Sequence, residues 1–247
     1  MPEASPLELV EPGCLTLVCA DLDARPLFWT DAGRQRHGFE PAVATAVAAS
    51  LGLTLQWRFL RWSEFVPSLL AGEADAIWCG AAITPERERQ MSFSRPYAVF
   101  DESVLVRAAD RIETPHDLRG RRVGAITGST NMALAETWPG CERIGFDGTS
   151  DDVFAEMIAS LRSGHVDAVV DDEPAFGGLL QDRSLRIAFT VATGNRWAAA
   201  LRPGNLALKQ ALDSALLSLD ELGRLRQAWN RWLPTIDYPA DRLGGQS

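Results

Sequence analysis

The sequence predicts an α/β fold made of two similar lobes, and two observations support this prediction. A ten-residue pattern occurs twice, as SLLAGEADAI over 68–77 and as SLRSGHVDAV over 160–169, with Ser, Leu, Gly, Asp and Ala in register. Each copy leads from a helical pattern through a glycine into an apolar run, as in the helix-to-strand half of a βαβ unit. A common helix end before a buried strand would look the same. Strand and helix patterns also alternate in both halves, so we expect each lobe to be a mostly parallel sheet flanked by helices.

The composition is that of an ordinary globular protein, and it excludes several classes of partner. Of the 247 residues, 46% are hydrophobic and 23% are charged, which suits one large domain or two smaller ones. The net charge of −9 argues against nucleic acid or an anionic membrane as a partner, because both require a basic surface. No run of about 18 apolar residues is present, so we expect no transmembrane helix.

The elements of the first half follow from hydrophobic spacing and helix-end signals. Apolar residues at Val43, Val47 and Leu51 have helical spacing, and Gly52 ends that helix. Ser63 is expected to cap the next helix. In chain order we expect a strand over 14–20, a long loop, a helix over 39–51, a strand over 53–60, a helix over 63–70 and a strand from 76.

The second half repeats this order after a linker-like segment over 107–120. Asp151 and Asp152 precede a helix, where carboxylates interact favourably with the positive end of the helix dipole. The C-terminal helical pattern is expected to divide into two helices near Gly223. In chain order we expect a strand over 123–127, a helix from 132, a helix over 153–164, a strand over 167–171, a strand over 186–191 and the two C-terminal helices.

A first candidate binding segment follows the first copy of the repeat. Small residues from Gly80 to Ala82 would let a ligand approach the backbone closely. Thr84 and Pro85 then begin a short helix with proline at its first position. Arg87 could donate two parallel hydrogen bonds to a carboxylate from that helix. The alternative is that Arg87 is a surface arginine near a helix start.

Two further candidate segments lie in the second half. Ser129 and Thr130 stand between a strand and a helix, where free amides and hydroxyl groups can bind an anion, although a simple helix cap has the same pattern. Asp171, Asp172 and Glu173 follow a buried strand. That edge of a parallel sheet binds ligands, and one of the carboxylates could pair with an ammonium group there. A polar surface loop is the alternative.

Other residue types give weaker signals. Trp62 lies between a strand and a helix, where a flat side chain can pack against a ligand, whereas most other aromatic residues are expected in the core. The three histidines are scattered and no metal-ligand spacing is present, so we expect neither a metal nor a cofactor. Cys14 and Cys19 fall on opposite faces of a strand, which argues against a disulfide between them.

Taken together, these segments resemble the periplasmic solute-binding proteins for polar amino acids, the receptors of ABC importers. The resemblance runs from Leu15 to about Leu233 and depends on the combination and order of several motifs. These motifs are GFEPAVATAVAASLG, WSEFVPSLLAGEADA, ITPER followed by FSRPY, DLRGRRVG with GST, and LRSGHVDAVVDD. In that family two α/β lobes close over an amino acid, so the resemblance implies a two-lobed periplasmic-binding-protein-like fold.

The resemblance implies roles for the residues that match. Arg87 matches the arginine that binds the α-carboxylate of the ligand, assisted by the amides of Ala82 and Thr130 and by the Thr130 hydroxyl. Asp172 matches the carboxylate that binds the α-ammonium group, with the Gly80 carbonyl as a second acceptor. Many relatives have Ser or Thr at the position of Ala82, so one hydroxyl to the carboxylate is absent here.

Three more residues complete the expected ligand-binding set. Trp62 matches an aromatic wall of the site, and Asp21 matches an acid that often contacts the ligand's side chain. Ser129 adds the hydroxyl next to Thr130. The first loop departs from the family pattern, because PLFW stands where shorter P-F forms are usual. Asp21, the aromatic residues and the acidic composition favour a polar or basic ligand.

The family arrangement also implies a discontinuous first lobe. Arg87 would belong to lobe one, and Thr130 and Asp172 to lobe two, so only a closed state would bring them all to the ligand. The expected boundaries are 1–101 with 194–247 for lobe one, 102–193 for lobe two, and hinge crossings near 101–106 and 189–195.

We therefore expect the substrate-binding component of an ABC importer, a monomer that closes over an amino acid or related zwitterion and delivers it to an inner-membrane permease. Two alternatives on this fold stay open: an enzyme similar to cyclohexadienyl dehydratases, with Glu173 as general acid, and a ligand-binding sensor domain. The family implies a periplasmic or extracellular location. The N-terminal sequence MPEASPLELVEP lacks the basic and apolar regions of a signal peptide, which leaves a cytosolic form open.

Overall fold

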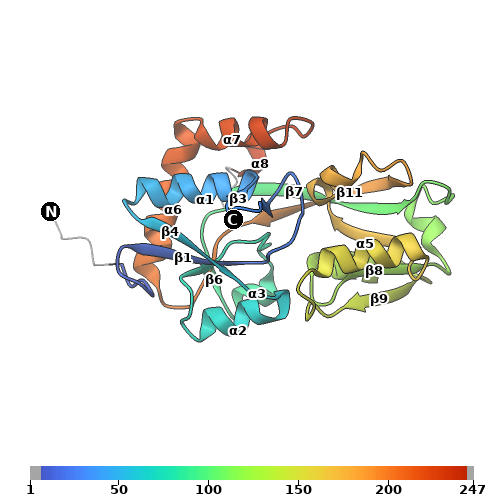
Figure 1. Ribbon diagram of the computed structural model, residues 1–247, viewed down its shortest axis with the longest axis horizontal. Coiled ribbons are helices and arrows are strands. Elements are labelled where there is room, and N and C mark those ends of the chain that lie inside the picture. The colour runs from blue at the N-terminus through green and yellow to red at the C-terminus, as the bar shows by residue number, and fades with distance from the viewer. Residues whose placement is uncertain (1–6, 244–247) are drawn as a thin grey trace. The chain divides into compact units, whose positions relative to one another are not determined.

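The computed structural model describes residues 7–243, which form two compact units (Figure 1). Of the described residues, unit 1 comprises 7–20, 37–99 and 196–243, and unit 2 comprises 21–36 and 100–195. Each unit contains one five-stranded sheet. The loop over 21–36 groups with unit 2, whereas the expected lobe one included it.

The sheet of unit 1 is parallel at its centre and antiparallel toward one edge. Its strands lie in the order β4-β1-β5-β12-β6. Strand β1 is parallel to β4 and β5, while β12 is antiparallel to β5 and β6. All six residues of β1 are buried, as expected for a central strand covered on both faces. The strands are β1 (Cys14–Cys19), β4 (Thr54–Phe59), β5 (Ala76–Ile77), β6 (Ser92–Phe93) and β12 (Ala200–Leu201).

Helices cover both faces of this sheet (Figure 1). Helix α1 packs against β4, α6 and α7, while α2 packs against β1 and β5. Phe39 of α1 meets Trp229 of α7 edge-on, with ring centroids 5.4 Å apart. Gly223, at φ 69°, separates α6 from α7, which confirms the expected break. The helices are α1 (Phe39–Ser50), α2 (Phe65–Leu70), α3 (Pro85–Glu88), α6 (Leu206–Glu221), α7 (Arg224–Trp232) and α8 (Ala240–Leu243).

The helix expected over 63–70 forms in two parts, and the expected Ser63 cap is wrong. A short 3₁₀ helix, η1 (Trp62–Glu64), precedes α2, whose N-cap is Glu64. The Glu64 carboxylate accepts a hydrogen bond from the Arg61 N–H at 2.9 Å. This reverse cap closes the first turn, so Ser63 lies inside the 3₁₀ turn rather than before the helix.

Unit 2 has a mixed sheet in the order β11-β7-β10-β8-β9. Strand β8 is parallel to β9 and β10, and β10 is antiparallel to β7. Strands β7 and β9 are missing from the sequence-based expectation. Residues of β7 are buried on both faces, which removes the alternating pattern that marks a strand. The strands are β7 (Ala98–Arg107), β8 (Arg122–Ile126), β9 (Glu142–Phe146), β10 (Ala168–Asp172) and β11 (Leu185–Trp197).

The helices of unit 2 carry the caps that the sequence indicates. The Asp152 side chain accepts from the Ala155 N–H at 2.8 Å and caps α5, which ends at Gly164 in the left-handed region at φ 79°. Helix α4 begins at Thr130, two residues earlier than the expected start at Met132, because Ser129 is its cap. The helices are η2 (Pro115–Leu118), α4 (Thr130–Glu136), α5 (Val153–Ser163) and η3 (Glu173–Leu179). A two-residue ribbon, β2 (Trp29–Thr30) with β3 (Arg36–His37), lies in the loop after β1.

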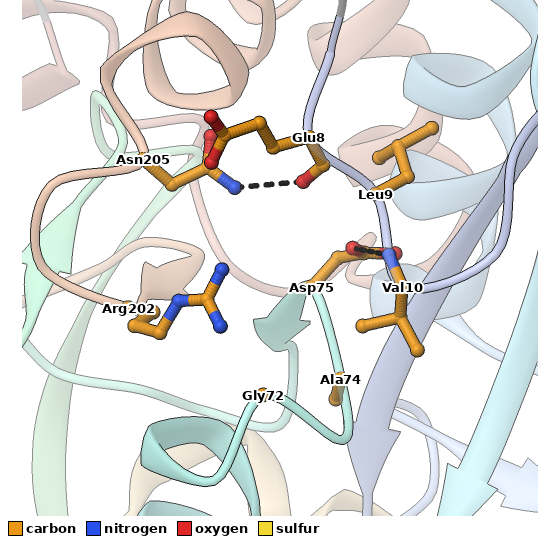
Figure 2. A pocket seen from close by; sticks show the side chains of 8 residues that line it. All are labelled: Glu8, Leu9, Val10, Gly72, Ala74, Asp75, Arg202 and Asn205. Carbon is orange, nitrogen blue, oxygen red and sulfur yellow. Dashed lines mark hydrogen bonds between the residues drawn. The ribbon is translucent and has the colours of Figure 1, made fainter.

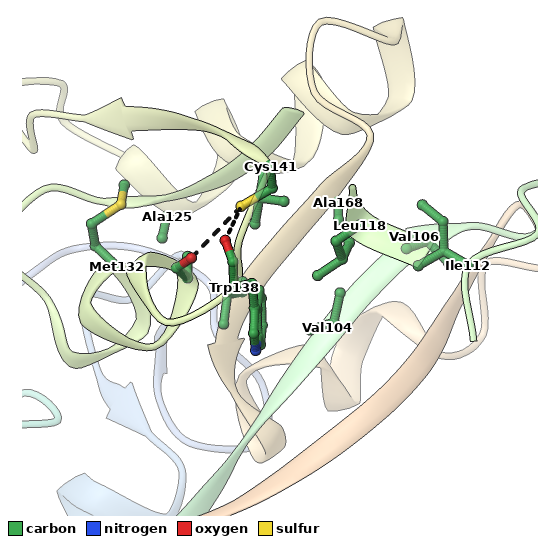
Figure 3. Packing of buried hydrophobic residues seen from close by; sticks show 12 residues of the cluster. Val104, Val106, Ile112, Leu118, Ala125, Met132, Trp138, Cys141 and Ala168 are labelled. Atoms are coloured by element: carbon green, nitrogen blue, oxygen red, sulfur yellow. Dashed lines mark hydrogen bonds between the residues drawn. The ribbon is translucent and has the colours of Figure 1, made fainter. Parts of the chain in front are cut away.

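One face of the unit 2 sheet packs against α4 through a dry apolar cluster (Figure 3). Met132 and Ala135 of α4 contribute to this cluster together with Val104 of β7 and Val170 of β10. The Cys141 thiol donates to the Trp138 carbonyl at 3.3 Å. This packing fixes the start of α4 against the strands β7 and β10, whose ends carry acidic residues.

The repeated decapeptide has the same structural role in both units. Asp75 Oδ2 accepts from the Thr16 N–H at 2.7 Å, and the Asp75 N–H donates to the Thr16 carbonyl at 2.9 Å. Asp167 repeats this arrangement with Arg122, through distances of 3.0 Å and 2.8 Å. Each aspartate thus joins the turn before one strand to the neighbouring strand, β1 or β8. The pattern is therefore a structural motif that precedes β5 and β10.

Some features are absent from residues 7–243. Within that range, no helix combines the length and apolarity needed to span a membrane. No group of three or more His, Cys, Asp or Glu side chains in the same range could hold a metal ion. The four cysteines lie in this range, are buried and form no disulfide there.

We expect Asp75→Ala to destabilise unit 1 strongly. The Asp75 carboxylate is 4% exposed and accepts from the N–H groups of Thr16 and Val10 at 2.7 and 2.8 Å. Removing it leaves both donors without their partner, which should lower the free energy of unfolding by about 2 to 4 kcal/mol. Urea unfolding measures this. The exposed Asp237 is the matched control, and its alanine variant should change stability by less than about 0.5 kcal/mol; equal losses would refute the role of Asp75.

Candidate functional site

In unit 1, the turn after β5 is built on a glycine that other side chains cannot replace. Gly80 has φ 63°, in the left-handed region. A Cβ at this position would lie 3.2 Å from the Trp197 ring. The Trp197 ring therefore occupies the space that a side chain at position 80 would need, so only glycine fits this turn.

A buried glutamate holds this turn in place. The Gly80 N–H donates to Glu40 Oε1 of α1 at 3.0 Å. The Tyr97 hydroxyl donates to the same oxygen, and Glu40 is only 1% exposed. The Tyr97 ring stacks on Trp78, with centroids 4.6 Å apart. Burial and the Glu40 charge both raise the pKa of Tyr97, so the phenol stays a hydrogen-bond donor.

Arg87 and Ala82 are brought together in this unit. Thr84 caps α3 by accepting from the Arg87 N–H at 3.2 Å, and Pro85 is the first helical residue, as expected. The Arg87 guanidinium donates to the Ala82 carbonyl at 3.0 Å. The backbone of Ala82 also forms an isolated antiparallel β-bridge with that of Trp197. The arginine side chain is thus directed back over the Gly80–Ala82 turn, which is the geometry that an anion site at this turn would need.

Trp62 lies on a different part of unit 1. It is the first residue of η1, is half-buried, and its ring contacts Phe65 at a centroid distance of 5.4 Å. Its position between β4 and α2 agrees with the sequence analysis. Its role as a wall of the binding site stays a prediction.

In unit 2, Ser129 and Thr130 have different environments. The Ser129 hydroxyl accepts from the Met132 N–H at 3.0 Å and donates to the Ile126 carbonyl at 2.6 Å. Both hydrogen-bonding functions of Ser129 therefore serve the start of α4, as the alternative of a simple cap implies. Thr130 is half-buried, and its hydroxyl accepts from Asn195 Nδ2 at 3.3 Å.

Three carboxylates gather where β7 and β10 lie side by side. The antiparallel register places Asp172 opposite Glu102 and Asp171 opposite Ser103. Glu102 is 1% exposed and Asp172 is 7% exposed. Asp172 Oδ1 is buried and has no hydrogen-bond partner among the described residues. The end of β10 therefore carries buried acidic groups whose hydrogen bonding is incomplete.

Neutral side chains surround these carboxylates. Asn131 Nδ2 donates to Glu102 Oε1 at 2.9 Å. Asn131 and Asn195 also interact with Asp172 through side-chain hydrogen bonds. Because Asn195 also reaches Thr130, the two residues of unit 2 that the sequence assigns to opposite ends of a ligand belong to one polar network.

Burial dominates the ionisation of this cluster. The pKa of Asp172 is raised well above its ordinary value by burial, by Asp171 and by Glu102. Burial also raises the pKa of Glu102, against the hydrogen bonds that it accepts. Burial, together with the charge of Glu102, raises the pKa of Asp171 to about 7. Such a site favours a bound cation, because a positive charge offsets the repulsion between the carboxylates and part of the free-energy cost of burying them.

Asp21 lies apart from this cluster within unit 2. Its Oδ2 accepts from the Arg34 guanidinium at 2.9 Å, and its side chain is 35% exposed. Burial raises the pKa of Asp152, and the charges of Asp23 and Asp21 add to that effect. A second acidic region thus surrounds the start of α5.

Two pockets within single units are lined by none of the eight predicted site residues. In unit 1, a pocket of about 200 Å³ is lined by residues that include Arg202 and Asp75 (Figure 2). At this pocket, Asn205 Nδ2 donates to the Glu8 carbonyl at 2.9 Å. In unit 2, a pocket of about 290 Å³ lies between α5 and η3. Its walls include Asp23, Asp152, Phe154 and Ile158.

The sequence analysis missed four residues that organise the candidate site. Glu40 is an acid in the first turn of a helix whose neighbours are apolar, and Glu102 interrupts the apolar run of β7. An isolated charge in an otherwise buried pattern is the signal that could have identified both. Asn131 and Asn195 give no comparable signal, because an asparagine near a helix start or in a strand end is common on protein surfaces.

We expect Asp171→Asn to change the pH dependence of stability. The folded pKa of about 7 lies above the ordinary value near ~3.9. The stabilisation that Asp171 contributes is therefore complete below that ordinary value and is lost as the pH rises through about 7. Between pH 5 and pH 8 the wild type should lose about 2 kcal/mol relative to the variant, measured by urea unfolding.

Asp182 provides the matched control for this measurement. Ser184 and Arg162 lower its pKa to about 2. Asp182→Asn should therefore have the same effect on stability at pH 5 and at pH 8, because Asp182 is ionised at both. Parallel pH profiles for Asp171→Asn and the wild type would show that Asp171 titrates normally.

Comparison of the sequence with known proteins identifies a family and several relatives. Residues 17–235 match the family "Bacterial extracellular solute-binding proteins, family 3". The ABC transporter arginine-binding protein 1 of Escherichia coli (strain K12) is 26% identical over 204 residues, which cover 80% of this chain and 82% of that protein.

Solved structures show the same fold. An ancestral arginine-binding protein bound to arginine has a TM-score of 0.80 at 27% identity and covers 90% of this chain and 98% of its own. The ancestral amino acid-binding protein AncCDT-1, a precursor of cyclohexadienyl dehydratase, has a TM-score of 0.77 at 26% identity, with 89% and 95% covered. These similarities confirm the predicted two-lobed α/β fold. Because the family match spans most of the chain, the protein belongs to the bacterial extracellular solute-binding proteins of family 3.

Proposed function

We propose that this protein is the amino-acid-binding component of an ABC importer. The observation that supports this best is the buried Asp172, whose Oδ1 has no hydrogen-bond partner among the described residues and whose neighbours Asp171 and Glu102 are also acidic. A cationic group is the ligand chemistry that this environment favours. The α-ammonium group of an amino acid supplies it, with hydrogen-bond donors for the unpaired oxygen.

We assign the binding of the ligand's negatively charged carboxylate to unit 1. Arg87 binds the α-carboxylate, and its guanidinium is already directed over the turn by its hydrogen bond to the Ala82 carbonyl. The Ala82 amide and the Thr130 amide and hydroxyl assist it. The Gly80 carbonyl is the second acceptor for the ammonium group, and Glu40 holds the preceding peptide through the Gly80 N–H. Two fixed ends of opposite sign select a zwitterion over a simple anion or cation.

The side chain of the ligand is assigned to Asp21 and Trp62. Asp21 lies next to further acidic residues, since the charges of Asp21 and Asp23 both act on Asp152. A polar or basic side chain suits that environment, and the Trp62 ring offers a flat apolar wall. Ser129 contributes through the position of α4 rather than through its hydroxyl, which is fully used by the helix start.

The wider biological setting follows the family. We infer a monomer with a hinge between its two units, with expected lobe boundaries at 1–101 with 194–247 and at 102–193. Closure of the lobes over the amino acid would present the loaded protein to an ABC permease of the inner membrane. A periplasmic or extracellular location suits that partner.

A second candidate function is an enzyme of the dehydratase type. Two observations favour it: the similarity to AncCDT-1, a precursor of cyclohexadienyl dehydratase, and the pKa of Glu173, which burial and Asp101 both raise. A carboxylic acid with a raised pKa can act as a general acid. Incubation with prephenate or arogenate tests this candidate, because product formation that Glu173→Gln abolishes would favour the enzyme over the binding protein.

A thermal-shift screen against the amino acids tests the main proposal. A ligand that binds only the folded protein at a hundred times its Kd should stabilise it by about 2.7 kcal/mol. Basic and polar L-amino acids are expected to raise Tm, whereas their N-acetyl derivatives, which lack the α-ammonium charge, are not. A Tm that no amino acid raises would refute the proposal, and shifts confined to acidic or aliphatic amino acids would refute the assigned ligand class.

Arg87→Ala should abolish most of this binding while the fold stays intact. Loss of a charge-assisted, partly desolvated pair should cost about 2 to 5 kcal/mol of binding free energy, measured by calorimetry. Arg89 is the matched control, because it follows the same helix and is exposed; Arg89→Ala should bind as the wild type does. Equal affinities for Arg87→Ala and the wild type would show that the carboxylate binds elsewhere.

A further inference from the structure

The function proposed above uses Glu102 only as an acidic neighbour, although it faces Asp172, the residue on which that function depends. Glu102 of β7 and Asp172 of β10 are directly opposed in the antiparallel register. Residues opposed in this way have Cβ atoms about 4.5 to 5.5 Å apart on the same face of the sheet. Both side chains are more than nine-tenths buried. Two carboxyl groups therefore share one small buried space.

The donors around the two carboxyl groups are neutral and shared. Asn131 and Asn195 form side-chain hydrogen bonds with both Glu102 and Asp172. Thr130 and Thr193 also form side-chain hydrogen bonds with Glu102. Asp172 Oδ1 still has no hydrogen-bond partner among the described residues. The shared amides thus leave one of the four carboxylate oxygens without a partner among the described residues, and neither amide carries a positive charge.

Further acids are neighbours of the pair along the chain. Asp171 is next to Asp172 on β10, and Asp101 is next to Glu102 on β7. Glu173 begins η3. The charges that act on Asp172 are those of Asp171 and Glu102. Two like charges a few ångströms apart in a buried site cannot both ionise, so a bound proton or a bound cation must compensate one of them.

On the basis of the proposed amino-acid binding, we propose that Glu102 and Asp172 form a carboxyl pair that holds one proton in the free protein and exchanges it for the ligand's ammonium group. In the exchange, the O–H bond of the protonated carboxyl group breaks, and its proton passes to a solvent base. The ammonium N–H groups then donate to the two carboxylates. The total charge of the pair and its compensating cation is unchanged.

This exchange makes Glu102 a determinant of specificity. A ligand with a permanent positive charge and several N–H donors replaces the proton, whereas a neutral amide or hydroxyl group does not. The exchange also couples affinity to pH. Where the pair is protonated in the free protein and ionised in the complex, Kd should fall about tenfold for each unit rise in pH.

Calorimetry measures the exchanged proton directly. L-Arginine, or the amino acid with the largest thermal shift, is titrated at pH 7 into the protein in phosphate and in Tris, whose ionisation enthalpies differ. The wild type should release close to one proton per ligand bound. Glu102→Gln should release clearly less than the wild type, and its Kd should depend less steeply on pH between 6 and 8, because only burial and Asp171 then raise the pKa of Asp172. Glu156→Gln, an exposed glutamate on α5, is the control that should keep the release.

The outcomes separate this inference from the proposed function. Binding by the wild type without proton release would overturn the exchange and leave the amino-acid-binding function intact. A second measurement needs no ligand: as the pH rises from 5 to 8, the Tm of the wild type should fall relative to that of Glu102→Gln, because the proton is lost from the folded pair. Parallel Tm profiles would refute the shared proton. Diverging profiles without binding of any amino acid would support it and refute the proposed function.

Discussion

A buried carboxylate must find hydrogen-bond donors inside the protein, and this constraint organises both units. Asp75 and Asp167 satisfy it with backbone amides of neighbouring strands, and Glu40 Oε1 accepts from the Gly80 N–H and the Tyr97 hydroxyl. Each of these acids therefore fixes a piece of backbone. Asp172 differs in its neighbours, because Asp171 and Glu102 place further negative charge beside it. The same physical demand builds the frame in three places and leaves a cluster of acids in the fourth.

Much of the fold could be predicted because its signals are local. Glycines and caps at helix ends, such as Gly223 and Asp152, and the apolar runs of β1 and β10 are read from a few adjacent residues. The sequence-based prediction of the fold fails where contacts between residues far apart in the chain determine the structure. Strand β7 is recognisable only through its pairing with β10, and the loop over 21–36 contains no signal that would group it with unit 2.

The candidate site was predictable at the level of residue type but not of environment. The Gly80–Ala82 turn, Arg87 and Asp172 follow from the motifs and their order. The sequence could not show that the Ser129 hydroxyl is fully used by its helix, or that Glu102 faces Asp172 from a strand about 70 residues away in the chain. Such facts depend on register and burial, which a single sequence determines only through the whole fold.

Asp75 and Asp167 each form a bridge of two hydrogen bonds to a neighbouring strand. This arrangement affects how the ligand specificity of such a protein can change in evolution. Each bridge secures the turn before β5 or β10, whereas Gly80, Ala82 and Arg87 follow β5 and Asp172 is the last residue of β10. Substitutions after the strands can therefore alter recognition without disturbing the anchoring contact. The two lobes can therefore keep their fold while mutations elsewhere change which ligand is bound. An acid such as Glu102 can be gained or lost by a single mutation.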